Sequence, residues 1–108
     1  MTEPWVWLAP YVDGAPVRLS ERMRAAVEQS QGASVHAHLA DAASICLRAA
    51  LLHPTRKSAA LDLLSADALL THACAAAAAA ESNELAQFTA LLDAQHFQEM
   101  LDDRSDQH

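Results

Sequence analysis

A run of leucines and alanines from Ser58 to Ala80 constrains the fold of this chain more than any other stretch. It reads SAALDLLSADALLTHACAAAAAA and contains neither Gly nor Pro, so strong helix formers dominate it without interruption. On a helical wheel its leucines point in several directions and leave no clean polar face. A helix that is apolar nearly all round is normally buried. We therefore expect a central helix that the remaining residues cover.

The segments on either side of this run predict further helices. Serines that suit N-cap positions and a Gly and a Pro that act as stop signals delimit them. The expected spans are Ser20–Gln31, Ser34–His53, the central helix from Pro54 or Thr55 to Ala80, and Ser82 or Asn83 to Leu101. The sequence thus predicts an all-α fold, a small up-down bundle of about four helices in a single domain over residues 1–108.

Two details of this scheme have alternatives. The central helix could break at Leu64–Asp67, where Ser65 could cap a new start, but the absence of Gly and Pro favours continuity. The polar residues 104–108 at the end of the chain predict a loose tail.

The first 19 residues predict an irregular N-terminal arm. Three of the four prolines lie before residue 17 and favour extended backbone over a regular helix, and Asp13-Gly14 is typical of a hairpin turn. Three of the five aromatic residues are here, namely Trp5, Trp7 and Tyr11. We expect the arm to cover Ala-rich surface of its own bundle. The alternative is that these three residues contact a second copy or another protein.

Charge is distributed unevenly along the chain. The net charge is −7, which disfavours nucleic acid and anionic membranes as partners. Six of the seven basic residues lie in the first 57 positions, and residues 58–103 contain no Lys or Arg. Either the two halves neutralise each other within one bundle, or an exposed acidic surface meets a basic partner.

The sequence also predicts a cytoplasmic location. The N-terminus lacks the positive charge and apolar run of a signal peptide. The longest uncharged helical run, Ala68–Ala80, is shorter than the roughly 20 residues that a bilayer span needs. Cys46 and Cys74 lie in apolar helical surroundings, where we expect free, buried thiols.

Histidines on helix faces suggest one metal site. His38 and Asp41 are three residues apart on one predicted helix, and Asp93 and His96 have the same spacing on another. If those helices faced each other, two imidazoles and two carboxylates could converge on a metal ion. The Glu-x-x-His motif of di-iron bundles does not occur in the sequence, however. His96 and His72 are also candidates for buried neutral imidazoles or for ligand-binding groups.

The sequence contains no catalytic motif of the P-loop, CxxC, HExxH or GxSxG type. We therefore expect no enzymatic activity and no cofactor. The function that the sequence favours is a small acidic protein-interaction or structural helical bundle, with self-association included, in which Trp5, Trp7 and Tyr11 make contacts. The alternative is a ligand- or metal-binding bundle that uses His38, Asp41, Asp93 and His96.

Overall fold

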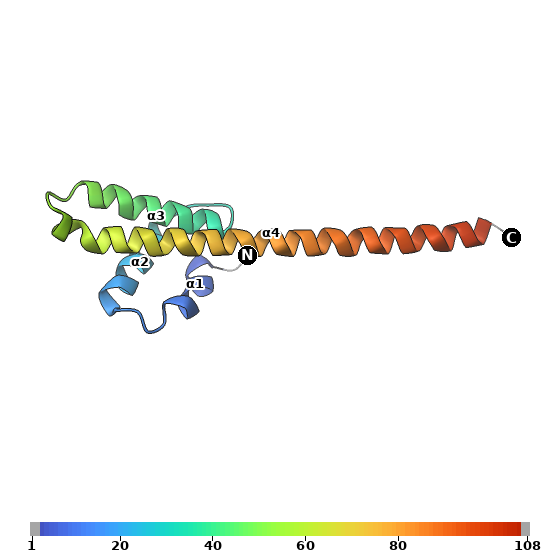
Figure 1. Cartoon of the computed structure of the whole chain (residues 1–108), viewed down its shortest axis with the longest axis horizontal. Helices are drawn as coiled ribbons and strands as arrows, with labels where there is room; N and C mark the ends of the chain where they lie inside the picture. The colour runs from blue at the N-terminus through green and yellow to red at the C-terminus, as the bar shows by residue number, and fades with distance from the viewer. Residues whose placement is uncertain (1–2, 107–108) are drawn as a thin grey trace. The chain divides into compact units, whose positions relative to one another are not determined.

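The structure, a computed structural model, describes the backbone of residues 3–106 and the side chains of residues 3–102. The all-α prediction is confirmed, because the described residues form four helices and no strand (Figure 1). The chain divides into two compact units, Met1–Ala77 and Ala78–His108. Each unit is described below by itself.

The predicted irregular arm is wrong, because its residues form helix α1, Pro4–Val12. Pro4 lies in the first turn, where the missing N–H costs nothing. Pro10 lies in the last turn of α1 and is its one internal proline. Pro16 lies outside α1, at the start of α2. The Asp13-Gly14 turn does form, with a φ of 87° at Gly14, but it joins two helices and not two strands.

Helix α2, Val17–Gln29, begins three residues before the predicted start. Pro16 takes the N-cap position without a side-chain cap, and its carbonyl oxygen accepts hydrogen bonds from the N–H groups of Leu19 and Ser20. Ser20 is therefore inside the helix, where its hydroxyl donates to the carbonyl of Val17. Met23, Ala26 and Val27 are buried on one side of α2, and Leu19 packs against the core.

Helix α3, Val35–Leu51, has the predicted N-cap. The hydroxyl of Ser34 accepts a hydrogen bond from the N–H of Ala37 at 3.2 Å, which satisfies one of the donors left free at the helix start. The helix ends two residues before the predicted end, in a turn that leads to Pro54. Leu52, the C-cap residue, is 87% exposed.

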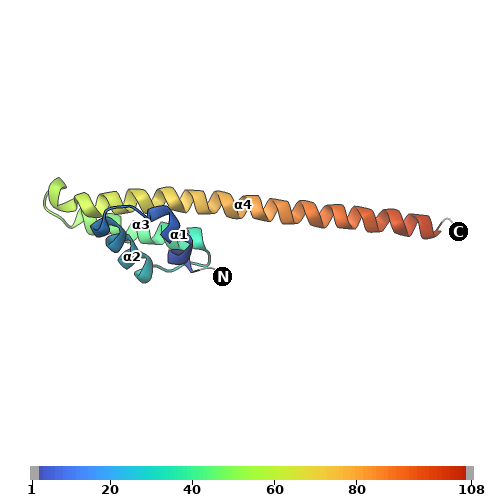
Figure 2. The ribbon, with the colours of Figure 1, turned by 90° about the horizontal axis from the view of Figure 1, so that it is seen from below.

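Helices α1, α2 and α3 and the first part of α4 form the core of the first unit (Figure 2). The short turn after Leu51 brings α3 and the start of α4 side by side (Figure 1). The largest fully buried apolar side chains come one or two from each helix and are Leu8, Met23, Leu39, Cys46 and Leu69. Trp5 and Trp7 are partly buried against this cluster, as expected of large aromatic side chains.

Helix α4, Arg56–Asp106, merges the two C-terminal helices that the sequence predicted. The expected continuity at Leu64–Asp67 is confirmed, but the expected new helix at Ser82 is wrong. No Gly or Pro follows Pro54, and the alanine run through Ala80 keeps the backbone helical. The tail was predicted to be loose from residue 104, yet residues 104–106 belong to α4, and residues 107–108 lie outside the described part.

The first unit covers α4 on one face only, so the expectation of a helix covered nearly all round is wrong. The buried positions recur every three or four residues at Ala59, Asp62, Ser65, Leu69, Ala73 and Ala76. Leu63, Leu64 and Leu70 lie between them and are exposed.

Among the described residues, the second unit consists of the C-terminal part of α4. All side chains described from residue 81 to residue 102 are exposed.

Candidate functional site

The aromatic residues of α1 pack against other helices of the first unit. The rings of Trp7 and Tyr11 have centroids 4.9 Å apart, and the ring of Tyr11 lies 5.5 Å from that of His72 on α4. The guanidinium of Arg24 lies 5.6 Å from the centre of the Trp5 ring, within range of a cation–π interaction. The expectation that the aromatics cover their own bundle is thus confirmed for Trp5 and Trp7, while Tyr11 remains 60% exposed.

His38 and Asp41 hold the turn between α2 and α3. Nδ1 of His38 lies 3.0 Å from the hydroxyl of Ser30, which donates to the carbonyl of Val27. A carboxylate oxygen of Asp41 accepts a hydrogen bond from the N–H of Gln31 at 2.8 Å. Both side chains therefore have local structural partners, and His38 also lines a depression of about 410 Å³ with Trp5 and Arg24.

Asp93 and His96 lie in the second unit, and both are exposed. The expectation of a buried imidazole at His96 is therefore wrong, and His72 is half-buried beside Tyr11. Within the described residues, no three His, Cys, Asp or Glu side chains form a group that could hold a metal ion. The metal site of His38, Asp41, Asp93 and His96 stays a prediction.

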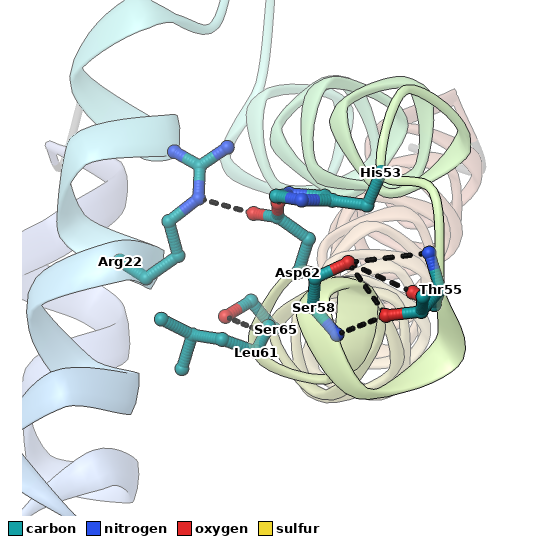
Figure 3. A network of polar contacts seen from close by, with 7 residues as sticks. All are labelled: Arg22, His53, Thr55, Ser58, Leu61, Asp62 and Ser65. Carbon is teal, nitrogen blue, oxygen red and sulfur yellow. Dashed lines mark hydrogen bonds and ion pairs between the residues drawn. The ribbon is translucent and has the colours of Figure 1, made fainter.

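Sequence reasoning missed the polar centre of the first unit, which is Asp62 (Figure 3). This carboxylate is buried. It accepts a hydrogen bond from Nε of Arg22 at 2.5 Å and forms an ion pair with Nε2 of His53 at 2.9 Å. Burial acts to raise the pKa of Asp62, but the hydrogen bonds from Arg22 and His53 outweigh it and hold that pKa below its usual value. The hydrogen bond to Asp62 in turn raises the pKa of Arg22.

A reciprocal cap fixes the start of α4 beside this centre (Figure 3). The N–H of Ser58 donates to the hydroxyl of Thr55 at 3.1 Å, and the N–H of Thr55 donates to the hydroxyl of Ser58 at 3.3 Å. This is the geometry of a capping box with Ser in place of the usual Glu. One turn of helix beyond Asp62, the hydroxyl of Ser65 donates to the carbonyl of Leu61, so both buried polar residues on this face of α4 are satisfied.

Two depressions lie near the start of α4, and both include His53. One, of about 590 Å³, is lined by basic side chains and by leucines, among them Arg18, Lys57 and Leu64. The other, of about 300 Å³, includes Leu51 and Arg56. We call the surface formed by Arg18, Leu51, Arg56, Lys57 and Leu64 the basic end. Its three cations form no ion pair with any residue in the described part of the chain.

An apolar groove of about 300 Å³ runs between α3 and α4 in the first unit. Its lining is mainly Ala and Leu and includes Leu47, Leu63 and Leu70, with one acidic residue, Asp67. All three leucines are exposed. The groove follows from the uncovered side of α4.

The second unit presents large apolar side chains to solvent. Leu85, Phe88 and Leu92 are 65%, 58% and 47% exposed and follow the spacing of three and four residues that places them on one helix face. Met100 continues this face two turns later. We call Leu85, Phe88, Leu92 and Met100 the apolar stripe.

Helix α4 is the one described helix that is long and apolar enough to span a membrane by length and composition. The candidate span is Arg56–Asp102, and 28% of its most apolar window is buried. Because the core helix of a soluble protein meets the same criteria, the cytoplasmic location stays a prediction.

Comparisons with protein-family models, curated proteins and solved structures found no match for this chain.

Proposed function

We propose that this protein is a helical protein-interaction module that associates with itself through the second unit. The observation that supports this proposal most directly is the apolar stripe. Leu85, Phe88 and Leu92 are about half exposed on a helix segment in which every described side chain from residue 81 onward is exposed. A contiguous exposed apolar face is typical of an interaction surface.

The helix itself supports the same proposal. An isolated helix in water is marginal even when it is rich in alanine, and most helices in proteins are stabilised by packing of an apolar face. Residues 81–100 have such a face, and every side chain described there is exposed. Burying three large side chains would contribute roughly 1.5–3 kcal/mol each, which would stabilise the helix and the complex together.

Sedimentation equilibrium over a range of concentrations tests this proposal. We expect the wild-type chain to associate and the variant L85Q/F88Q/L92Q to remain monomeric. The matched control is A86Q/A90Q/A94Q, which adds the same three amides on the opposite side of the helix and should associate like the wild type. A wild-type chain that stays monomeric up to millimolar concentration would overturn the proposal.

Experiments with lipid vesicles show whether the apolar stripe binds a membrane or a protein. We expect the wild-type chain to stay in the supernatant when it is centrifuged with zwitterionic or anionic vesicles. If the wild-type chain sediments with the vesicles and the L85Q/F88Q/L92Q variant does not, the apolar stripe binds membranes, and the proposal of protein association is wrong.

A further inference from the structure

We infer that residues 81–102 of one copy dock on the basic end of the first unit of a second copy. This inference rests on the proposed self-association and specifies which two surfaces meet. It is carried by charge complementarity between two surfaces of the same chain, each of which also exposes large apolar side chains.

The charge of the docking segment disfavours pairing with its own counterpart. Its charged residues are all acidic, namely Glu81, Glu84, Asp93, Glu99 and Asp102. Glu81 and Glu99 lie on the same side of the helix as the apolar stripe, given 100° per residue. A parallel pair would set each of them against its own copy, and an antiparallel pair would set Glu81 against Glu99. Either arrangement brings like charges together, which is destabilising.

The basic end has the opposite charge without internal compensation. Asp62 is the acidic residue that lines the same depression, but Arg22 and His53 already pair with it. Arg18, Arg56 and Lys57 are exposed and unpaired within the described residues, which leaves three cations to meet a partner.

The position of two of these cations is itself unfavourable. Arg56 and Lys57 lie in the first turn of α4, which contains no acidic residue. The positive end of the helix dipole lies there and normally favours Asp or Glu. An acidic segment bound at this place would relieve the repulsion between the two basic side chains and the helix end.

Apolar side chains on both surfaces supply the remaining complementarity. Leu51 and Leu64 of the basic end are 78% and 59% exposed, so an amphipathic helix could cover them with its apolar stripe while its glutamates reach the cations. If each of two copies docks its segment on the other, the two interfaces are identical and the assembly closes as a dimer.

Charge reversal of each surface tests this arrangement. We expect E81K/E84K and R56E/K57E each to raise the dimer dissociation constant at least about tenfold. An equimolar mixture of the two variants should dimerise again, because both interfaces of the mixed dimer then pair opposite charges. The single-chain variant E81K/E84K/R56E/K57E should likewise recover dimerisation within about threefold of the wild type.

Two controls make the result specific. R48E reverses an exposed arginine outside the basic end and should leave the dissociation constant nearly unchanged. At a concentration where the wild type is monomeric, the melting midpoint of the first unit must not be lower than the wild-type value in any variant, so that loss of dimer is not loss of fold.

The outcomes separate this inference from the proposed function. If the wild type dimerises and L85Q/F88Q/L92Q does not, but R56E/K57E dimerises normally, self-association stands and docking on the basic end is refuted. A mixture of E81K/E84K and R56E/K57E that stays monomeric would also refute it. If the wild type itself stays monomeric at every concentration, both proposals fail.

Discussion

Arg22 on α2 and Asp62 on α4 form an ion pair between positions 40 residues apart in the sequence, and the same carboxylate pairs with His53 in the turn before α4. The carboxylate thus connects α2, the α3–α4 turn and α4 at one point. Because Asp62 is buried and doubly partnered, its charge is stabilised in the folded chain and not in the unfolded one.

Replacement of Asp62 should therefore destabilise the first unit. We expect D62N to lower the free energy of unfolding by roughly 2–3 kcal/mol, because it removes hydrogen bonds to a charged group and leaves Arg22 unpaired. Urea unfolding followed by circular dichroism measures this change. D67N is the matched control, since Asp67 is exposed on the same helix, and it should change stability by less than about 0.5 kcal/mol. Equal effects of the two substitutions would contradict the structural role of Asp62.

Acid should remove the same stabilisation. The pKa of Asp62 is lower in the folded chain than its ordinary value, so the unfolded chain binds a proton more readily as pH falls. The contribution is complete above the unfolded pKa, near 3.9, and is lost as pH falls through the lower folded pKa. We expect the stability difference between wild type and D62N to shrink as pH falls below about 4. A difference that grows as pH falls below about 4 would contradict the assigned direction.

Truncation of Leu8 tests whether α1 is docked. Leu8 is fully buried, whereas Val6 on the same helix is 58% exposed. We expect L8A to lower the free energy of unfolding by about 2–5 kcal/mol, as Leu-to-Ala changes in cores do. V6A should cost well under about 1 kcal/mol. The fluorescence emission of Trp5 and Trp7 should shift to longer wavelength in L8A at lower denaturant, and an unchanged midpoint would show that α1 does not pack as described.

Gly32 should tolerate no side chain. A Cβ there would lie 2.7 Å from the backbone N of His38 and 2.8 Å from the backbone C of Ala37, and backbone atoms cannot move aside as a flexible side chain can. We expect G32A to cost about 1–3 kcal/mol through this overlap. G14A meets no atom within 4 Å but keeps a positive φ, so its cost of about 1–2 kcal/mol is conformational. Thermal melting of both variants checks these values.

The two thiols should differ in reactivity. Cys46 is fully buried, and burial raises the pKa of its thiol, whereas Cys74 is exposed. We expect a thiol reagent such as iodoacetamide to modify Cys74 rapidly in the native chain and Cys46 only on unfolding. Mass spectrometry of the wild type and of C74S reads out the two sites. Rapid native modification of C74S would contradict the burial of Cys46.

Local signals predicted much of the fold. The cap at Ser34 depends on neighbouring residues and was confirmed. Asp13-Gly14 forms a turn, but it joins two helices and is not the predicted hairpin turn. The prolines misled because their number suggested extended backbone, whereas Pro4 occupies a position at the helix start that tolerates proline. Proline content alone does not show where in a helix each ring falls.

The candidate site was less predictable. The pairing of Arg22 with Asp62 depends on how α2 and α4 meet, and no spacing in the sequence signals a contact across 40 residues. The sequence also did not predict which face of α4 the first unit would leave uncovered, because alanine fits at both buried and exposed positions. His96 follows the apolar periodicity of its helix, but this periodicity does not show whether a partner within the chain covers that face.

The uninterrupted course of α4 beyond Ala77 has a thermodynamic consequence. None of the side chains described from residue 78 to residue 102 is buried, so in a single copy their helical order comes from intrinsic propensity and not from packing. Heating should therefore unravel this segment gradually from its C-terminal end, before the cooperative transition of the first unit. Its amide protons should exchange with deuterated solvent far faster than those of Leu39 or Leu69. This difference in exchange rate should become smaller as the protein concentration rises.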